Sequence, residues 1–297
     1  MLNLAKRSRR IALTEGTLAG VSFGTAAIFI RLLSGLNVYS IAFWRLIIAI
    51  GALGAVILVS RKSFERCKVR ENIRKFVILG FLLGLHFILF ASAVADTTIL
   101  NATVLVNTTP IFSMLVSSFL FKVKPSYVVA IGILVSFLGV GIIAYADASP
   151  SALSVHLKGD FEAVLAAVVE GFYLNYGREV RRKVSLIPLM IAIYSLSALT
   201  VAVASVLTWN PVTFTISQPS LILYLIGLGI VPTAFAHTFY FSSLSHLKSF
   251  ETATMALLEP IGATLLGIGV FSEIPNPFFI VGAFLVLCGI FSVATAR

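Results

Sequence analysis

Ionisable and amide side chains stand at intervals inside stretches of this chain that are otherwise almost wholly apolar. Polar groups in such stretches are costly within a membrane, so they usually face protein or water and serve a function. Arginine offers donors that fit a carboxylate or a phosphate, and a carboxylate can hold an amine or a proton. The candidate substrate-binding residues are Phe23, Arg45, His86, Phe90, Asn107, Glu170, Tyr173, His237, Tyr240 and Glu259.

Arg45 lies five residues inside an apolar stretch that begins at Ser40. At 1.5 Å per residue it is about 7–10 Å below the end of its helix, and a long side chain can reach the membrane surface from that depth. Two roles are open. Arg45 either anchors its helix at the interface or pairs with a helix end, or it contacts a carboxylate or phosphate of the substrate from the outer side.

Two glutamates stand in other apolar segments. Glu170 shares a helical face with Tyr173 and Gly177, which suits a lined cavity. Its open roles are protonation during transport, contact with a substrate amine, and a neutral acid bonded within the protein. Glu259 precedes Pro260, which frees backbone groups of the preceding turn. We expect the Glu259 carboxylate to bond those groups, with substrate binding as the alternative.

Histidine and aromatic side chains recur together on other apolar segments. His86 lies one turn before Phe90, and His237 lies three residues before Tyr240. A single histidine in a membrane segment is more often a hydrogen-bond partner between helices than a ligand. Two histidines and several aromatic rings at one centre would suit an amphipathic organic substrate.

Motifs for other chemistry are missing from the sequence. HExxH does not occur and the four histidines lie far apart, so we expect neither a metal nor a catalytic site. GxxxxGK[ST] does not occur either, so we expect no nucleotide cofactor and no ATP-driven pumping by this chain. Cys67 and Cys288 form no CxxC pair, which argues against a disulfide framework.

The elements that position these residues must be membrane helices. Hydrophobic residues make up 59% of the chain and charged residues only 11%, against about 25% charged in soluble domains. The apolar runs are continuous over about 20 residues and do not alternate, which favours helices over a barrel. We expect an all-α integral membrane protein with ten transmembrane helices, at residues 12–33, 38–60, 76–95, 100–121, 126–146, 160–177, 187–207, 220–243, 250–271 and 277–295.

The basic residues are unevenly distributed between the two sides of such a bundle. If the N-terminus is cytoplasmic, 19 of the 22 Lys and Arg residues fall on the cytoplasmic side. This is the pattern of the positive-inside rule. It predicts a multi-pass protein of the plasma (cytoplasmic) membrane with both termini in the cytoplasm, partnered by a lipid bilayer and not by nucleic acid. The oligomeric state stays open between monomer and homodimer.

The chain also repeats itself. A shift of 150 residues places residues 87–143 on residues 237–293, and a looser match sets residues 22–31 beside 169–178. The matched prolines and glycines are Pro110/Pro260, Pro125/Pro275, Gly132/Gly282 and Gly139/Gly289. Pro110 and Pro260 fall near the middles of their spans, where we expect each to kink its helix and open room for a cavity, with a kink that serves packing alone as the alternative. Each half carries five predicted spans, and an odd number means that the second half enters the membrane from the other side. Such inverted repeats are typical of secondary transporters, which bind substrate between the repeats near the middle of the bilayer.

Three stretches resemble a known family. LLEPIGATLLGIGVFSEIPNPFFIVGAFLVLCGI resembles the second EamA-type module of the drug/metabolite transporter superfamily, FASAVADTTILNATVLVNTTPIFSMLVSSF the first module, and AFWRL its early arginine motif. The resemblance implies an EamA-like five-helix module at 1–147 and a second, inverted one at 148–297. The chain departs from the family pattern at Val123, where the second half has Glu273, and at Phe23, which replaces a common tryptophan.

The resemblance further implies transport of small metabolites, such as amino acids or related organic ions, with export favoured. Alternating access around a pocket between the modules would carry it, driven by the substrate gradient or by protons. Two rival functions stay open. An integral-membrane enzyme acting on lipid-borne substrates would need acids, histidines or cysteines clustered at one membrane face, and a channel would conduct without saturating.

Overall fold

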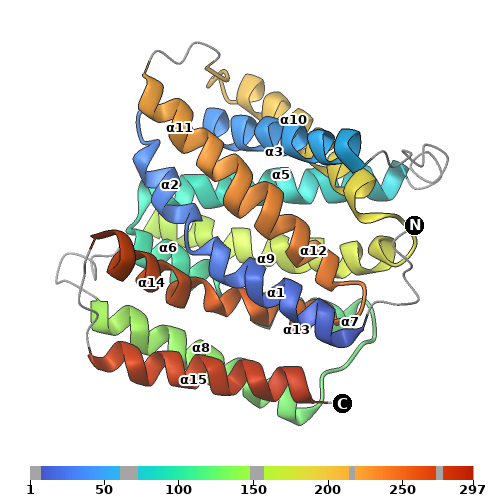
Figure 1. Cartoon of the computed structure of the whole chain (residues 1–297), viewed down its shortest axis with the longest axis vertical. Coiled ribbons are helices and arrows are strands. Elements are labelled where there is room, and N and C mark those ends of the chain that lie inside the picture. Colours follow the sequence, from blue (N-terminus) through green and yellow to red (C-terminus); the bar gives the residue numbers. More distant parts are fainter. Residues whose placement is uncertain (1–7, 61–72, 148–156, 214–217, 272–276, 297) are drawn as a thin grey trace.

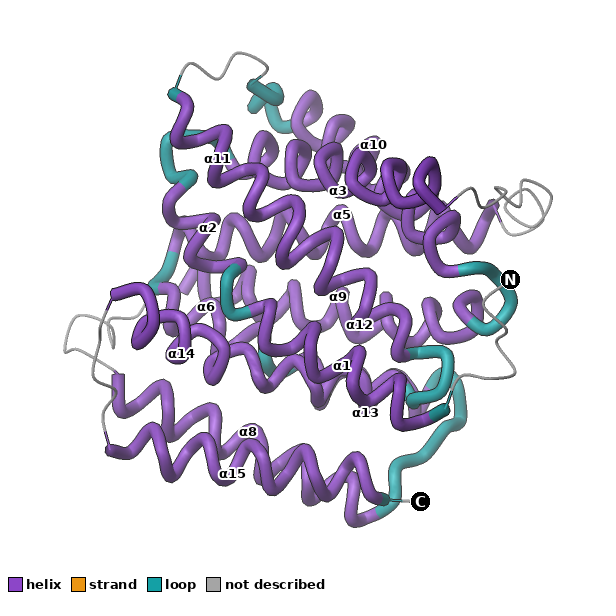
Figure 2. The backbone as a smooth tube through the Cα atoms, viewed as in Figure 1, coloured by secondary structure: helices purple, strands orange, loops and turns teal. Residues whose placement is uncertain are grey.

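The computed structural model describes residues 8–60, 73–147, 157–213, 218–271 and 277–296. Within these ranges every regular element is a helix (Figure 2). Six spans are single helices: α3 (Val38–Ser60), α5 (Ile73–Asp96), α8 (Tyr127–Asp147), α9 (Leu157–Arg181), α10 (Leu186–Leu207) and α15 (Pro277–Thr295). The other spans in the described ranges consist of two or three consecutive helical segments each: α1 (Arg9–Phe23) and α2 (Ala26–Leu32); α6 (Ile99–Val106) and α7 (Thr109–Phe119); α11 (Pro219–Leu228), η2 (Gly229–His237) and α12 (Thr238–Ser243); and α13 (Ser249–Met255), η3 (Ala256–Leu258) and α14 (Glu259–Phe271).

The prediction of an all-α membrane fold with ten spans is confirmed. In the described ranges, seven segments are long and apolar enough to cross a membrane. The largest difference from the predicted ends is in α9, which runs from Leu157 to Arg181 where residues 160–177 were expected. The extra turns carry charges such as Lys158 and Arg178, which a hydrophobicity criterion trims from a span although the helix continues through them.

Four spans are interrupted within the described ranges. The predicted distortions near Pro110 and Pro260 are confirmed: α6 gives way to α7 just before Pro110, and the 3₁₀ turn η3 stands just before Pro260. Proline removes a backbone donor and clashes with the preceding turn, which explains both places. The interruptions between α1 and α2 and in the π-helical η2 were not expected. At the first of these, Gly24 packs so closely on α14 that an added Cβ would lie 2.4 Å from the backbone nitrogen of Ala263.

The helices form a bundle whose edges differ (Figure 1). α8 and α15 lie side by side along one edge, while α3, α5 and α10 pack together at the other. The interrupted spans and α9 run between these two groups. Both described chain ends lie at the same end of the bundle, where Nη2 of Arg9 is 3.2 Å from the Ala294 carbonyl oxygen. We call this the inner end.

α8 and α15 cross with their backbones in direct contact. A Cβ at Gly289 would lie 2.3 Å from the oxygen of Gly132, and one at Gly139 would lie 2.6 Å from the oxygen of Gly282. Gly132 precedes Gly139 on α8, whereas its contact Gly289 follows Gly282 on α15, so the two helices run antiparallel. Between these contacts Ser136 Oγ donates to the Val286 carbonyl at 3.2 Å, and these two residues are themselves 150 positions apart. Residues without side chains are what such close helix packing in membranes requires.

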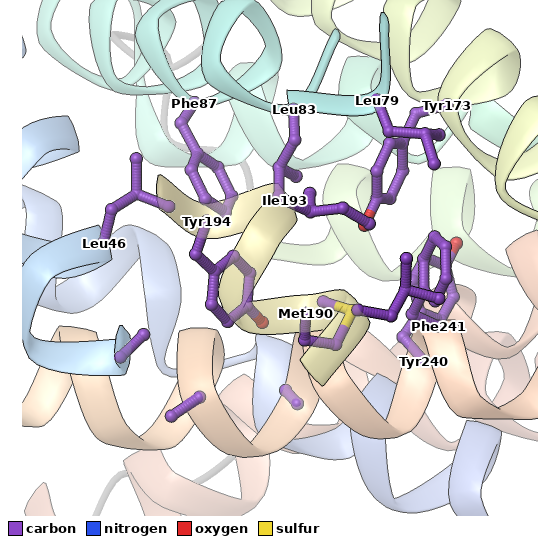
Figure 3. Packing of buried hydrophobic residues seen from close by; sticks show 14 of the residues in the cluster. Leu46, Leu79, Leu83, Phe87, Tyr173, Met190, Ile193, Tyr194, Tyr240 and Phe241 are labelled. Carbon is purple, nitrogen blue, oxygen red and sulfur yellow. The ribbon is translucent and has the colours of Figure 1, made fainter. Parts of the chain in front are cut away.

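A large apolar cluster holds α3, α5, α9, α10 and α12 together (Figure 3). Among its fully buried side chains are Leu46, Leu79, Phe87, Met190, Ile193 and Tyr194. Because the cluster joins long helices from both halves of the chain, it fixes the walls from which the polar side chains described below project.

Gly289→Ala should destabilise the protein, because its added methyl group has no room between α15 and α8. Overpacking of this kind costs about 1–3 kcal/mol. Gly141→Ala on α8 is the matched control, since no atom lies within 4 Å of its Cβ position. Thermal unfolding of the purified variants in detergent measures the difference. Equal melting temperatures for the two variants would contradict this account of the helix contact.

Candidate functional site

The four interruptions converge on one cavity in the middle of the bundle. It is lined by Phe23, Ala26, Arg45, His86, Phe87, Phe90, Val106, Asn107, Thr109, Glu170, His237, Ala256 and Glu259. Its volume of about 40 Å³ is enough for a few water molecules. In this conformer the protein is therefore nearly closed around the site.

Each interrupted span reaches the cavity at its interruption. Phe23 ends α1, Asn107 follows α6, His237 ends η2, and Glu259 begins α14. Irregular backbone at membrane depth is tolerated only where it is buried in protein or lines a cavity. The interruptions and the cavity are thus two aspects of one feature, and they place polar side chains where a solute could meet them.

The lining residues come in pairs under the 150-residue shift. Phe87 corresponds to His237, Val106 to Ala256 and Thr109 to Glu259, and all six line the cavity. Under the looser match, Phe23 corresponds to Glu170, and both line it as well. The cavity is therefore built from equivalent positions of the two halves, with different chemistry on each side.

Two buried carboxylates face the cavity from separate helices. Glu259 Oε2 accepts a hydrogen bond from Asn107 Nδ2 at 3.1 Å. Glu170 Oε2 accepts one from Thr109 Oγ1 at 3.3 Å and lies 3.8 Å from His86 Nδ1. Glu259 thus links α14 to the end of α6, and Glu170 links α9 to α7 and α5.

The expectation that Glu259 would bond freed backbone groups is wrong. Its own backbone N–H donates to the Ala256 carbonyl as the 3₁₀ turn closes, so the interrupted backbone is paired locally. The carboxylate instead reaches the Asn107 side chain, which stands at the matching interruption of the other half.

Arg45 points into the protein. Only 1% of its surface is exposed, its Nε donates to Thr233 Oγ1 at 3.0 Å, and its guanidinium carbon lies 3.9 Å above the Phe87 ring. Thr233 in turn donates to the Leu228 carbonyl, whose usual α-helical donor is missing because Pro232 has no backbone N–H. The expectation that Arg45 could reach the membrane surface as an anchor is wrong, because these inward partners replace water. Its Nη1 is buried without a hydrogen-bond partner among the described residues.

Aromatic and imidazole rings surround His237. Its ring centroid is 4.8 Å from that of Phe23, 4.9 Å from that of Phe87 and 6.1 Å from that of His86. His86 also stacks on Phe90 at 6.2 Å. In the part of the chain that the structure covers, His237 Nδ1 finds no hydrogen-bond partner. The predicted approach of two histidines and several aromatic rings to one centre is confirmed as geometry.

Two of the ten candidate residues, Tyr173 and Tyr240, do not line the cavity. Tyr240 contacts Phe23 edge-on at 5.2 Å, and Tyr173 packs against Phe241 at 5.3 Å (Figure 3). The expectation that Tyr173 shares a cavity face with Glu170 is wrong. Tyr173 is fully buried against Phe241 and does not line the cavity.

Sequence reasoning missed several lining residues. Phe87, Thr109, Ala26, Val106 and Ala256 are apolar or small, and such residues carry no distinctive signal in an apolar segment. For Phe87 and Thr109 a signal existed in the repeat, because the 150-residue shift pairs them with the candidates His237 and Glu259. Glu273 and Cys67, which were considered in the sequence, lie outside the described residues.

The EamA-like transporter family profile matches this chain twice, at residues 11–145 and 157–295. The chain belongs to the EamA-like transporter family. The resemblance to the drug/metabolite transporter superfamily, to which this family belongs, is thereby confirmed. With its helical spans, the EamA assignment makes the chain a multi-pass membrane transporter.

Relatives of this EamA-family chain extend over nearly its whole length. "Uncharacterized transporter YdfC" of Bacillus subtilis is 25% identical over 296 residues, covering 97% of this chain and 92% of the relative. "Uncharacterized transporter YxxF" of the same organism is 20% identical over 291 residues, covering 97% and 90%. A solved crystal structure with 18% identity has a TM-score of 0.80 and covers 97% of each chain, which shows a shared fold.

The bond between Asn107 and Glu259 should matter for the stability of this EamA-family protein. Asn107→Ala leaves the buried Glu259 carboxylate without this donor, which costs about 1–3 kcal/mol. Adding Glu259→Gln to Asn107→Ala should recover part of the loss, because a neutral amide is cheaper to bury. Thermal unfolding of both single variants and of the double variant measures this, and strictly additive losses would contradict a direct interaction.

Proposed function

We propose that this chain is a secondary transporter of small polar or amphipathic metabolites, amino acids or related organic ions, which it exports across the plasma membrane by alternating access. The observation that carries the proposal is the central cavity. Arg45 and His237 line it, each with a buried side-chain nitrogen that has no hydrogen-bond partner among the described residues, together with two carboxylates, Glu170 and Glu259, where four interrupted spans meet.

The proposed modules are residues 1–147 and 148–297, each of five spans and inverted relative to the other. Support comes from the antiparallel contact of α8 with α15, in which Ser136 meets its own repeat counterpart Val286. The pairing of cavity residues under the same shift adds to this. Because Arg9 and Ala294 lie at one end, the basic residue distribution is consistent with two cytoplasmic termini.

The chemistry of the cavity suits a solute that carries both charges. A carboxylate would receive hydrogen bonds from Arg45 Nη1 and His237 Nδ1, which have no partners in the described chain. An ammonium group would lie against Glu170 and Glu259. An amino acid does not fit a cavity of about 40 Å³, so binding and release require the halves to separate first on one side and then on the other.

Exchange of labelled amino acids in proteoliposomes tests this function. We expect saturable counterflow, whereas a channel would pass the solute without saturation and an enzyme would change the label chemically. Arg45→Lys keeps the charge but loses the planar group that stacks on Phe87, and the lost contacts should reduce counterflow by about tenfold or more. Lys158→Gln, at an exposed position of α9, is the control that should retain counterflow. Equal loss in both variants would contradict the role of Arg45.

The dependence of counterflow on pH tests the role of Glu170. Protonation removes the negative charge that faces a substrate ammonium, so counterflow should fall as the pH is lowered. Glu170→Gln is permanently neutral and should give lower counterflow that no longer varies with pH. Glu162→Gln, two turns away on α9, should keep the wild-type profile. An unchanged pH profile in Glu170→Gln would reject protonation of this residue during transport.

A further inference from the structure

A second cavity lies between the inner ends of α7 and α9. Its volume is about 360 Å³, far larger than that of the central cavity. We call it the inner vestibule. It is lined by Ser117, Phe121, Val123, Asn175, Arg178, Glu179, Arg182 and Lys183.

The inner vestibule is positively charged. Its one acidic lining residue, Glu179, forms ion pairs with Lys75 and with Lys183, the latter at 3.8 Å. Arg178 and Arg182 then have no acid among the lining residues to balance them. Arg178 is held in place by a hydrogen bond from its Nε to the Leu247 carbonyl at 3.0 Å. The chemistry of the vestibule fits an anionic group.

A polar seam connects the inner vestibule to the central cavity. On α7, Thr109, Ser113 and Ser117 follow at intervals of four residues and are all buried. Thr109 lines the central cavity and Ser117 lines the vestibule, so Ser113 lies between them. On the facing helix α9, Glu170 belongs to the central cavity and Asn175 to the vestibule. Glu170 and Asn175 are five positions apart, which corresponds to about 7.5 Å along the helix.

The Asn175 side chain bridges the seam where α9 packs closely on α7, since a Cβ at Gly171 would lie 3.0 Å from the Ser113 backbone nitrogen. Asn175 Nδ2 lies 3.0 Å from the Ser113 carbonyl oxygen and 2.8 Å from that of Gly171. Asn175 Oδ1 accepts a hydrogen bond from Ser249 Oγ at 2.6 Å. Asn175 is 4% exposed and so joins α7, α9 and the first turn of α13 with no space left between them.

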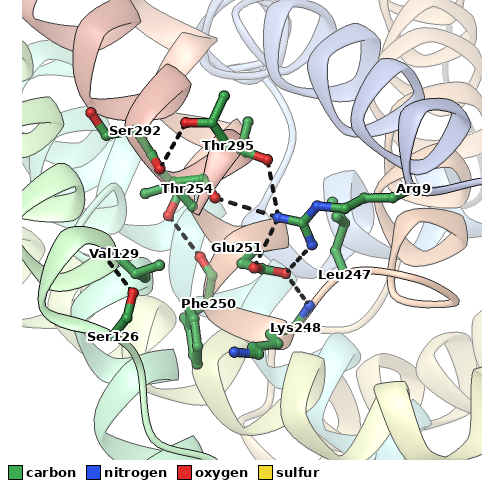
Figure 4. Close-up of polar contacts among 12 residues, drawn as sticks. Arg9, Ser126, Val129, Leu247, Lys248, Phe250, Glu251, Thr254, Ser292 and Thr295 are labelled. Atoms are coloured by element: carbon green, nitrogen blue, oxygen red, sulfur yellow. Dashed lines mark hydrogen bonds and ion pairs between the residues drawn. The ribbon is translucent and has the colours of Figure 1, made fainter. Parts of the chain in front are cut away.

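The first turn of α13 is also held from its other side (Figure 4). Arg9 from α1 forms two hydrogen bonds with the Glu251 carboxylate, at 3.1 and 3.2 Å, and its Nη2 lies 3.2 Å from the Ala294 carbonyl oxygen. Glu251 also accepts from the backbone N–H of Lys248 at 2.7 Å. Opening the seam therefore requires that α13 break its contact with Asn175, its contact with Arg9, or both.

We propose that the seam between α7 and α9 is the passage from the central cavity to the cytoplasm, that the hydrogen bonds of Asn175 hold it closed, and that the inner vestibule is a second binding site for the anionic group of the transported solute. The proposal rests on the proposed transport function and adds to it a path, a gate and a site. A solute carboxylate would be held between Arg178 and Arg182 while Asn175 still separates it from the central cavity.

Cysteine accessibility tests the path and the gate. The background is Cys67→Ser/Cys288→Ala, which removes both native cysteines. In inside-out membrane vesicles, Ser117→Cys should react readily with a charged, membrane-impermeant thiosulfonate, and Ser113→Cys should react slowly. Adding Asn175→Ala removes the hydrogen bonds that close the seam and should speed the reaction of Ser113→Cys by about tenfold.

Leu115→Cys is the matched control on α7, because Leu115 is 42% exposed on the outer surface of the bundle, where lipid excludes charged reagents. It should stay unreactive in both backgrounds. A Ser113→Cys variant that remains unreactive after Asn175→Ala, while Ser117→Cys reacts, would overturn the gate. An unreactive Ser117→Cys would overturn the vestibule as an open site.

The charge of the reagent tests the anion site. Ser117→Cys should react about tenfold faster with a sulfonate-bearing reagent than with a trimethylammonium one, because the net positive charge of the lining residues concentrates anions. Arg178→Gln/Arg182→Gln should abolish this preference. The preference should be the same in nanodiscs of phosphatidylcholine with and without phosphatidylglycerol. Its loss on adding phosphatidylglycerol would assign the vestibule to a lipid headgroup and overturn the solute site.

Counterflow by the wild-type protein separates this proposal from the function on which it rests. Exchange without the expected labelling pattern would contradict the seam and leave the transport function standing. The labelling pattern without exchange would contradict the transport function and leave a gated, anion-selective passage.

Discussion

Backbone polar groups at the depth of a membrane must find their partners inside the protein, and that requirement shapes the structure around the cavity. The interruptions before Pro110 and Pro260, at Gly24 and along η2 each remove backbone hydrogen bonds from a helix. All four lie at the same cavity, where side chains from other spans and local 3₁₀ or π turns supply partners. An interruption on the lipid-facing surface would leave backbone groups unpaired in lipid, so the membrane as well as the solute restricts where the site can lie.

The repeat explains how one cavity can offer two kinds of chemistry. Equivalent positions of the two halves line the same cavity but carry different residues. Thr109 corresponds to Glu259, and Phe87 corresponds to His237. The backbone frame is shared between the halves, as the Gly132 and Gly289 contact indicates, while the side chains have diverged. The solute with both charges that we propose rests on this divergence of the lining residues.

The sequence predicted the spans well because apolar run length depends on bilayer thickness and little else. It also located the distortions at Pro110 and Pro260, since proline acts locally. It did not predict the direction of Arg45, because depth along a helix says nothing about rotation around its axis. Glu259 was misjudged for a similar reason: its partner Asn107 is 152 residues away, and only the fold brings them together. Phe87 and Thr109 were missed because the repeat was used to find topology and not to transfer site residues.

The most direct test of the account asks whether one cavity is reached from both sides of the membrane in turn. Ala256 lines the cavity in η3, and its small side chain can be changed to cysteine with little disturbance. In a background without native cysteines, Ala256→Cys should be modified by an impermeant reagent applied to either right-side-out or inside-out vesicles, and modification from either side should stop counterflow. Modification from one side only, under all conditions of solute, would contradict alternating access around this cavity.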